Sequence, residues 1–409
     1  MPRPRTLAVF ALALTLAVGC AHLPACPNKG GPRWSEWTSP HFRVLTDVED
    51  ETDGETLATQ LEHFRAAIVA AAWRSVPEAG EPIEVAALAS VRETDVFLPF
   101  QTEGRFYSYL GTGIVIAPTT NQVARAKMLK HEIVHALMRQ LDLDRNAPIW
   151  FQEGIAMYLA TTSYTESSDE VTFGAVDPEA LRLIVHRGRT PWGELWLWPT
   201  DANEQAIHEA TSWFFVHYLF NYERERFQRF QAGLASTKDA KLLWSEIFPD
   251  MATPEAFERT LNSYGEGSSY ATYKLLIPRP HFSFATRPIP DGEVHALRAL
   301  LYLTAYGDND DAPTQMRVEL AEALRQEPLS LRARTVERLF LHENVADIDT
   351  AHALTSKFTG AWQAWLLLAA AYDGHHQSKA SSEALERARS LGFRGIAPAP
   401  TRPNVAAPY

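Results

Sequence analysis

Two histidines spaced four residues apart constrain this chain more than any other feature, and they stand in the run His131-Glu132-Ile133-Val134-His135. On an α-helix, this spacing places both imidazoles on one face, one turn apart, where both can reach one cation. Glu132 is offset from that face by about 100°. It is therefore poorly placed as a third ligand, but it can take a proton from a water held at the cation. The alternative is an accidental meeting of these residues on a core helix.

A second segment offers a third ligand. After a helix start signal at residues 146–148, an apolar helix carries Glu153 and then Gly154. A carboxylate in such a setting should be paired or bound to a metal, because burying it alone is expensive. Gly154 has no side chain, which would let a strand or the first helix approach closely. The two segments together predict a zinc site in which Glu153 joins the two histidines.

At these residues the sequence resembles the gluzincin metallopeptidases, and in particular the bacterial peptidase-MA-like family. The run from Trp150 to Ala156 is similar to that family's third-ligand helix, and the resemblance covers about residues 33–275. It implies an α+β fold in which a small mixed sheet is combined with zinc-site helices. The site residues that it implies are three Zn²⁺ ligands and a general base, namely His131, His135, Glu153 and Glu132.

Three departures from the family pattern shape the prediction. The chain lacks the Gly-x-Met-Glu-Asn segment with which gluzincin aminopeptidases fix a substrate's free amine, which favours endopeptidase action. Met157 stands where some gluzincins place an acid that orients the first imidazole, so that acceptor must come from elsewhere. Residues 209–213 lack the tyrosine that donates to the developing oxyanion, and His208 is the candidate catalytic replacement. The alternative for His208 is a solvated or capping residue.

Hydrophobic periodicity outlines the elements around this site. The elements expected are strands at 42–46, 83–88 and 113–117, a helix at 55–72, the zinc helix at 122–141, and further helices at 178–186, 203–222, 225–235, 238–247 and 254–263. Residues 96–100 and 106–109 are ambiguous. The resemblance suggests that Gly111 to Ala117 is an edge strand that pairs with an extended substrate. Such main-chain pairing gives affinity that does not depend on the side chains of the substrate. A zincin-like domain is thus expected over residues 34–276.

The C-terminal third of the chain is predicted to form pairs of helices. A proline-rich linker is predicted at residues 277–291, helical repeats at 292–395 and a flexible tail at 396–409. The spacing of bulky and small residues in the last pair matches a tetratricopeptide-like repeat, through Trp365, Leu368, Ala369, Tyr372, Leu385 and Ala388. Such repeats bury their faces against neighbours. They could form a groove for a protein partner, or they could simply pack as helices.

The N-terminus predicts export and lipid anchoring. Residues 1–19 combine a basic start with an apolar run of signal-peptide length, and Leu16 to Cys20 is similar to a bacterial lipobox. A lipidated Cys20 would hold the chain at the bacterial cell envelope, on its periplasmic or surface face, with residues 20–33 as a tether. The alternative is simple secretion, with a small disulfide between Cys20 and Cys26.

Composition limits the classes of partner. The 409 residues suffice for two domains, and 50 acidic residues against 38 Lys and Arg give a formal charge of -12. The chain therefore lacks the basic footprint of a nucleic-acid-binding protein. The sequence predicts a membrane-anchored zinc peptidase that acts on extracytoplasmic proteins or peptides. The alternative is a catalytically weak or inactive lipoprotein of zincin fold that binds or assembles proteins through its helical repeats.

Overall fold

The computed structural model describes most of the chain. The described residues are 27–48, 51–73, 81–98, 104–110, 112–119, 123–164, 169–199, 201–237, 239–267, 270–305, 310–341 and 347–393. The predicted signal peptide, Cys20, Cys26 and the tail at 396–409 lie outside these ranges. Among the helices inside them, none has the length and apolar character needed to cross a membrane.

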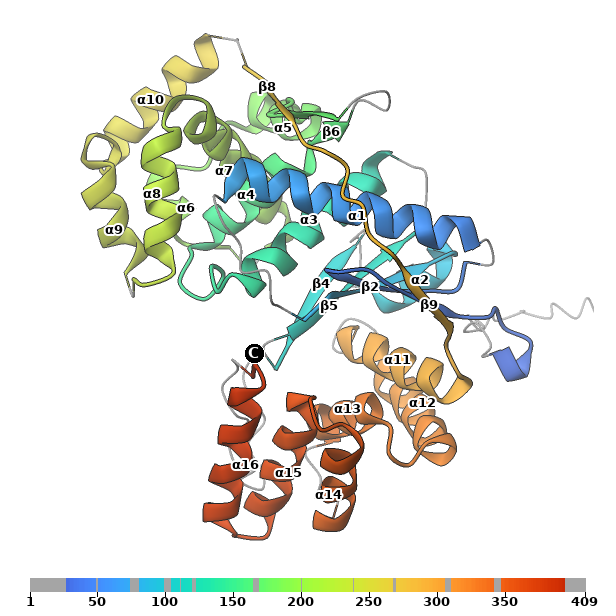
Figure 1. The fold of residues 1–409 in the computed structure, drawn as a ribbon. Coiled ribbons are helices and arrows are strands. Elements are labelled where there is room, and N and C mark those ends of the chain that lie inside the picture. The colour runs from blue at the N-terminus through green and yellow to red at the C-terminus, as the bar shows by residue number, and fades with distance from the viewer. Residues whose placement is uncertain are drawn as a thin grey trace, which may run out of the picture.

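The central element is a six-stranded mixed sheet with the strand order β4-β5-β3-β2-β1-β9 (Figure 1). Its strands are β1 (Ser35–Thr38), β2 (Phe42–Thr46), β3 (Ile83–Leu88), β4 (Arg105–Tyr109), β5 (Thr112–Pro118) and β9 (Ala285–Pro288). β2, β3 and β5 run parallel to one another, whereas the remaining neighbours are antiparallel. The strands predicted at 42–46, 83–88 and 113–117 are thereby confirmed.

The prediction of the edge strand is wrong. β5, which was expected at the edge, lies inside the sheet between β3 and β4, and β4 forms the edge. β5 is buried along almost its whole length, whereas the side chains of β4 are mostly half-buried. The sequence of a strand that is buried on both faces is a continuous run of apolar residues, as in β5, and such a strand lies in the interior of a sheet. Of the two ambiguous segments, the first overlaps the end of helix α2 (Val91–Phe97) and the second belongs to β4.

Helices cover both faces of the sheet. Successive side chains of a strand point to opposite faces, so Val44 enters one core and its neighbour Leu45 enters the other. Helices α1 (Glu51–Ala72) and α3 (Val123–Gln140) complete the first core, and α11 (Asp291–Thr304), α12 (Ala312–Gln326) and α13 (Leu331–Leu341) complete the second. Figure 1 shows α1 and α11 on opposite sides of the sheet. The chain is therefore an α and β protein whose sheet lies between two helical layers.

A largely helical region follows α3. It contains α4 (Ile149–Ala160), α5 (Pro178–Arg187), α6 (Trp192–Leu195), α7 (Ala202–Tyr222), α8 (Arg224–Leu234), α9 (Ala240–Ile247) and α10 (Pro254–Glu266). A small sheet of β6 (Ser163–Tyr164), β7 (Glu170–Phe173) and β8 (Tyr273–Leu276) accompanies them. Trp150 of α4 is fully buried, with its ring centroid 5.1 Å from that of Phe215 on α7. Aromatic packing thus fixes α4 within this region.

The C-terminal helices do not stand apart from the sheet. Residues 285–288, inside the predicted linker, form β9 and pair with β1, and α11 follows directly. Beyond α13, the helices α14 (Ile348–Lys357), α15 (Trp362–Gly374) and α16 (Ser378–Ser390) form smaller cores of their own. The last predicted helix pair is present as α15 and α16. The sheet and the helices that follow it therefore share one framework.

Gly154 lies where α4 meets α7. A Cβ atom at this position would lie 2.5 Å from the Ser212 carbonyl oxygen and 2.7 Å from Val216 Cγ2. The close approach that the glycine permits is therefore to α7, and not to a strand or to the first helix as the sequence suggested. This contact matters for the site because α4 carries Glu153 on the residue before.

Gly154→Ala is expected to lower the free energy of unfolding by about 1–3 kcal/mol. Alanine favours a helix over glycine by up to about 1 kcal/mol, but the added methyl meets backbone that cannot shift without moving a whole helix. The midpoint of urea unfolding measures the effect. Gly374→Ala is the matched control, because a Cβ at that helical glycine has no heavy atom within 4 Å. A Gly154→Ala protein as stable as the wild type would contradict the tight α4–α7 contact.

Candidate metal centre

The three predicted ligands meet at one point. His131 and His135 lie on successive turns of α3, and Glu153 reaches them from α4, which packs against α3. His131 Nε2 lies 3.0 Å from His135 Nε2. Glu153 Oε2 lies 3.2 Å from the first of these nitrogens and 3.4 Å from the second. Two imidazole nitrogens and one carboxylate oxygen thus form a group that could hold a metal ion.

The electrostatics of this group show what a cation would replace. Burial alone would raise the pKa of Glu153, but the imidazoles of His135 and His131 outweigh it and hold that pKa well below its usual range. Burial alone would lower the pKa of His135, but the Glu153 carboxylate outweighs it and raises that pKa to about 9. A proton on His135 therefore compensates Glu153 in the metal-free protein, and a bound cation must displace it.

Glu132 lies beside the group and is held by the edge strand. Its side chain is buried, and its Oε2 accepts a hydrogen bond of 2.6 Å from the backbone N–H of Phe106 on β4. Gly104, just before β4, packs closely under α3 and β5, since a Cβ there would lie 3.2 Å from Met128 Cγ and 3.3 Å from the Ile116 carbonyl oxygen. The structure therefore fixes one oxygen of the predicted base, and among the described residues the other oxygen, Oε1, has no hydrogen-bond partner.

Glu209 on α7 is a further acid near the group, and its role was missed from the sequence. Burial, followed by the charge of Glu153, raises the pKa of Glu209 to about 7, and both imidazoles act in the opposite direction. The reasoning that singled out Glu153, a carboxylate among apolar residues of a helix, applies equally to Glu209, which precedes Ala210 and Trp213. Met157 stands where some gluzincins place the acid that orients the first imidazole, and its side chain packs against the first core.

His208 is held within its own helix. Its side chain is buried, and its Nδ1 donates to the backbone oxygen of Glu204 at 2.8 Å. Its ring lies edge-on to Trp198, with the centroids 5.6 Å apart. Within the described ranges, no hydrogen bond, ion pair or ring contact joins His208 to the three ligands. His208 therefore lies buried in the second turn of α7, neither solvated nor at the helix end, and its catalytic role stays a prediction.

Comparison with known proteins adds no family to these observations. No protein-family model matches the chain, and a search of curated proteins finds no significant match. Function is therefore inferred from the residues and the geometry of the site.

Proposed function

We propose that the protein is a zinc-dependent peptidase that cleaves peptide bonds within proteins or peptides. The observation that carries this proposal is the convergence of His131 Nε2, His135 Nε2 and Glu153 Oε2, with Glu132 adjoining them. Two imidazoles and one carboxylate are the protein ligands of many catalytic zinc sites, in which a fourth position stays open for water or substrate.

The spacing of the three ligand atoms supports zinc. Zinc–ligand bonds of about 2.0–2.2 Å in a tetrahedron place the ligand atoms about 3.3–3.6 Å from one another. The three separations in the structure are 3.0, 3.2 and 3.4 Å. The side chains therefore need to move by only a few tenths of an ångström to fit this geometry, so little reorganisation opposes binding.

Glu132 has the position of a general base. Zinc, when bound, supplies Lewis acidity that polarises a carbonyl and makes water more acidic. The free oxygen of Glu132 accepts the proton of the attacking water and then gives it to the leaving amine. The hydrogen bond from Phe106 keeps the carboxylate in one orientation through both transfers. Proton transfer by a positioned side chain contributes about 10²–10⁴-fold to rate.

The edge strand supports an extended peptide as substrate. β4 has a strand neighbour, β5, on one side, so its other side is available to an added strand. The N–H of Phe106 already donates to Glu132 on that side, which places the start of such pairing next to the base. A polypeptide bound along β4 in this way would present a backbone carbonyl near the metal group, which favours endopeptidase action.

The lipobox-like run at Leu16 to Cys20 supports the cell envelope as the location of this activity. Acylation of Cys20 would hold the protein at a bacterial membrane surface, where its substrates would be extracytoplasmic proteins or peptides. Residues 20–33 would then act as the tether between the lipid and the folded part.

The test combines metal analysis with a peptide digest. We expect about one zinc ion for each protein molecule, as well as cleavage that Glu132→Gln abolishes without loss of zinc. Zinc in that ratio with no cleavage by either protein would contradict peptidase action and favour a protein-binding role for the C-terminal helices. Absence of zinc binding would contradict the metal centre itself.

Glu209→Gln is expected to have opposite effects on stability and on zinc binding. Because the folded-state pKa of Glu209 is raised from 4.5 to about 7, its favourable contribution is complete below pH 4.5 and is lost as pH rises through 7. Above pH 7 the substitution should therefore raise the free energy of unfolding of the metal-free protein, by about 1–3 kcal/mol. It should also weaken zinc binding about 10-fold, because a negative charge beside the cation is removed.

Urea unfolding at pH 8 and pH 4.5, together with a zinc competition titration, measures both effects. Glu204→Gln, an exposed residue of the same helix, is the matched control and should change neither quantity. Equal stability of the Glu209→Gln and wild-type proteins at pH 8 would show that Glu209 is not held in an unfavourable charged state.

A further inference from the structure

The edge strand β4 contacts the C-terminal helices near both of its ends. Arg105, at the start of β4, donates from Nη1 to the backbone oxygen of Thr304 at the end of α11, at 3.2 Å. Leu110, directly after β4, packs against the cluster that α15 and α16 form around Trp362 and Leu366. Figure 1 shows the β4–β5 hairpin extending toward α16. The strand that orients Glu132 is therefore fixed at both ends by helices far along the chain.

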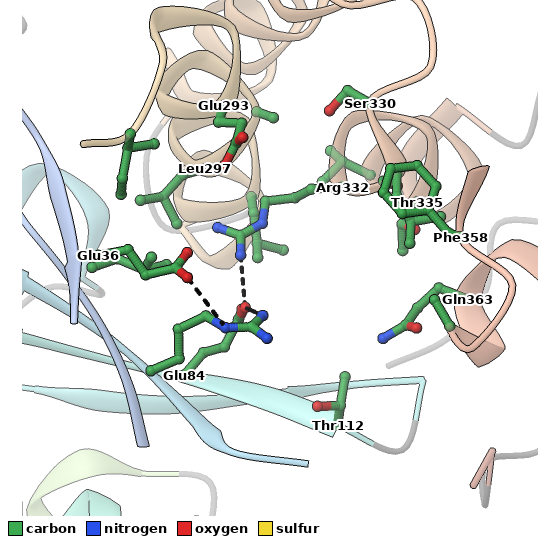
Figure 2. Close-up of a pocket in the computed structure, with 18 of the residues that line it drawn as sticks. Glu36, Glu84, Thr112, Glu293, Leu297, Ser330, Arg332, Thr335, Phe358 and Gln363 are labelled. Atoms are coloured by element: carbon green, nitrogen blue, oxygen red, sulfur yellow. Dashed lines mark hydrogen bonds and ion pairs between the residues drawn. The ribbon is translucent and has the colours of Figure 1, made fainter. Parts of the chain in front are cut away.

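A cavity lies beside the hairpin that turns at Leu110. A space of about 660 Å³ lies between the sheet and the helices α11, α13 and α15, and Tyr109 and Thr112 of the hairpin line it. Figure 2 shows Thr112 on the sheet side of this space and Arg332 on the helix side. Arg332 crosses it to Glu84 of β3 at 2.7 Å. Tyr107 and Tyr109 of the hairpin pack against the core of α11, α12 and α13, and Leu110 at the hairpin tip makes a separate contact with α15 and α16.

The backbone at Leu110 has a conformation that leucine rarely adopts. Tyr109 pairs with Thr112, so the turn between the strands has two residues. Leu110 has a φ of 48°, in the left-handed region that favours glycine or asparagine. A leucine in that region persists only where surrounding structure over-determines it. Here the side chain of Leu110 reaches the apolar cluster of α15 and α16, where Leu385 and Leu391 also pack.

We propose that Leu110 is a positioning residue through which α15 and α16 fix β4 against Glu132. One end of this connection is the apolar contact of Leu110, and the other is the hydrogen bond from Phe106 N–H to Glu132 Oε2. Three residues of β4, at positions 107–109, lie between the two. The C-terminal helices thereby set the orientation of the carboxylate. The consequence for catalysis rests on the proposed peptidase function, whereas the consequence for the strand does not.

Hydrogen exchange of the Phe106 amide in the metal-free protein tests the connection. We expect Leu110→Ala to speed that exchange about tenfold, which corresponds to about 1.4 kcal/mol, while amides of α1 and β3 keep their protection. Leu110→Met, which retains an apolar side chain of similar size, should restore the wild-type rate. If Leu110→Ala does not fold, Leu385→Ala removes the α16 side of the same contact and should give the same local change.

Leu329→Ala is the matched control, because Leu329, in the turn between α12 and α13, is also half-buried but packs against a cluster without β4. It should leave the Phe106 amide unchanged. Unaltered exchange in Leu110→Ala, or a rise that extends equally to α1, would overturn the proposal. In a peptide digest, Leu110→Ala should lower kcat more than it changes KM. If the wild type cleaves nothing, the peptidase proposal fails while the exchange result still decides the role of Leu110.

Discussion

Glu132→Gln is expected to lower kcat/KM for peptide hydrolysis by about 10²–10⁴-fold while zinc content stays at the wild-type level. An amide cannot take up the proton that the carboxylate accepts, yet it has nearly the same size. Its oxygen can also still accept the hydrogen bond from Phe106 N–H, which in the wild type measures 2.6 Å. The substitution therefore removes the base without releasing the edge strand. Steady-state cleavage of a fluorogenic peptide, with zinc measured on the same samples, gives both quantities.

A matched control separates loss of the base from loss of a glutamate. Glu383 on α16 is largely exposed, with its carboxylate 4.0 Å from Lys379, so Glu383→Gln should leave the rate unchanged. A Glu132→Gln protein that cleaves at the wild-type rate would rule out Glu132 as the base. A protein that loses both cleavage and zinc would instead identify Glu132 as part of the metal site.

Glu153→Ala is expected to weaken zinc binding by more than about 100-fold. Substitution of groups that only orient a ligand already costs about 10–100-fold, and Glu153 contributes a charged oxygen directly to the group. With zinc at 100 times the wild-type dissociation constant, binding stabilises the wild type by about 2.7 kcal/mol. The same concentration should stabilise the variant by no more than about 0.4 kcal/mol. Urea unfolding with and without zinc measures this difference.

Ile149→Ala provides the comparison on the same helix. Ile149 begins α4 and is 42% exposed, so its substitution should keep the zinc-dependent gain in stability. Equal gains for the Glu153→Ala and wild-type proteins would show that zinc binds without this carboxylate. The proposed site would then be wrong.

The metal-binding group could be predicted because its signals are local. The spacing of His131 and His135 defines one helical face, and Glu153 is a carboxylate in an apolar helix, so each signal lies within a few residues. The start of α4 after Pro148 could also be read from the sequence, and α4 begins at Ile149. What the sequence could not show is the approach of α3 and α4, on which the 3.0–3.4 Å separations of the ligand atoms depend.

The wrong assignment of the edge strand and the failure to identify Glu209 have the same cause, because both features depend on tertiary contacts. β4 contains Arg105 and Ser108 among its aromatic residues, and this mixture gave no clear strand or helix pattern. The apolar run of β5 is typical of an interior strand, a signal that the family resemblance overrode. Glu209 acquires its role only where α7 packs on α4, at the contact that Gly154 permits. Periodicity along one segment does not contain such contacts.

The strand β9 could not be foreseen for a different reason. Residues 277–291 are rich in proline, which lacks a donor for sheet pairing and therefore indicates a connector. β9 tolerates Pro288 because it is an edge strand paired on one side with β1. The segment thus brings the chain back to the sheet before α11 begins.

The two-sided burial of the sheet also bears on how the chain emerges from the ribosome. Leu45, Ala86 and Ile114 face a core that is completed by residues after Ile289, more than 170 positions beyond the last of them. Until those residues are synthesised, a nascent sheet would expose an apolar face, and β1 would be an open edge strand paired with β2 alone. The second face of the sheet can therefore be covered only after the C-terminal helices are translated, whereas the core around the metal ligands consists of residues that precede β9.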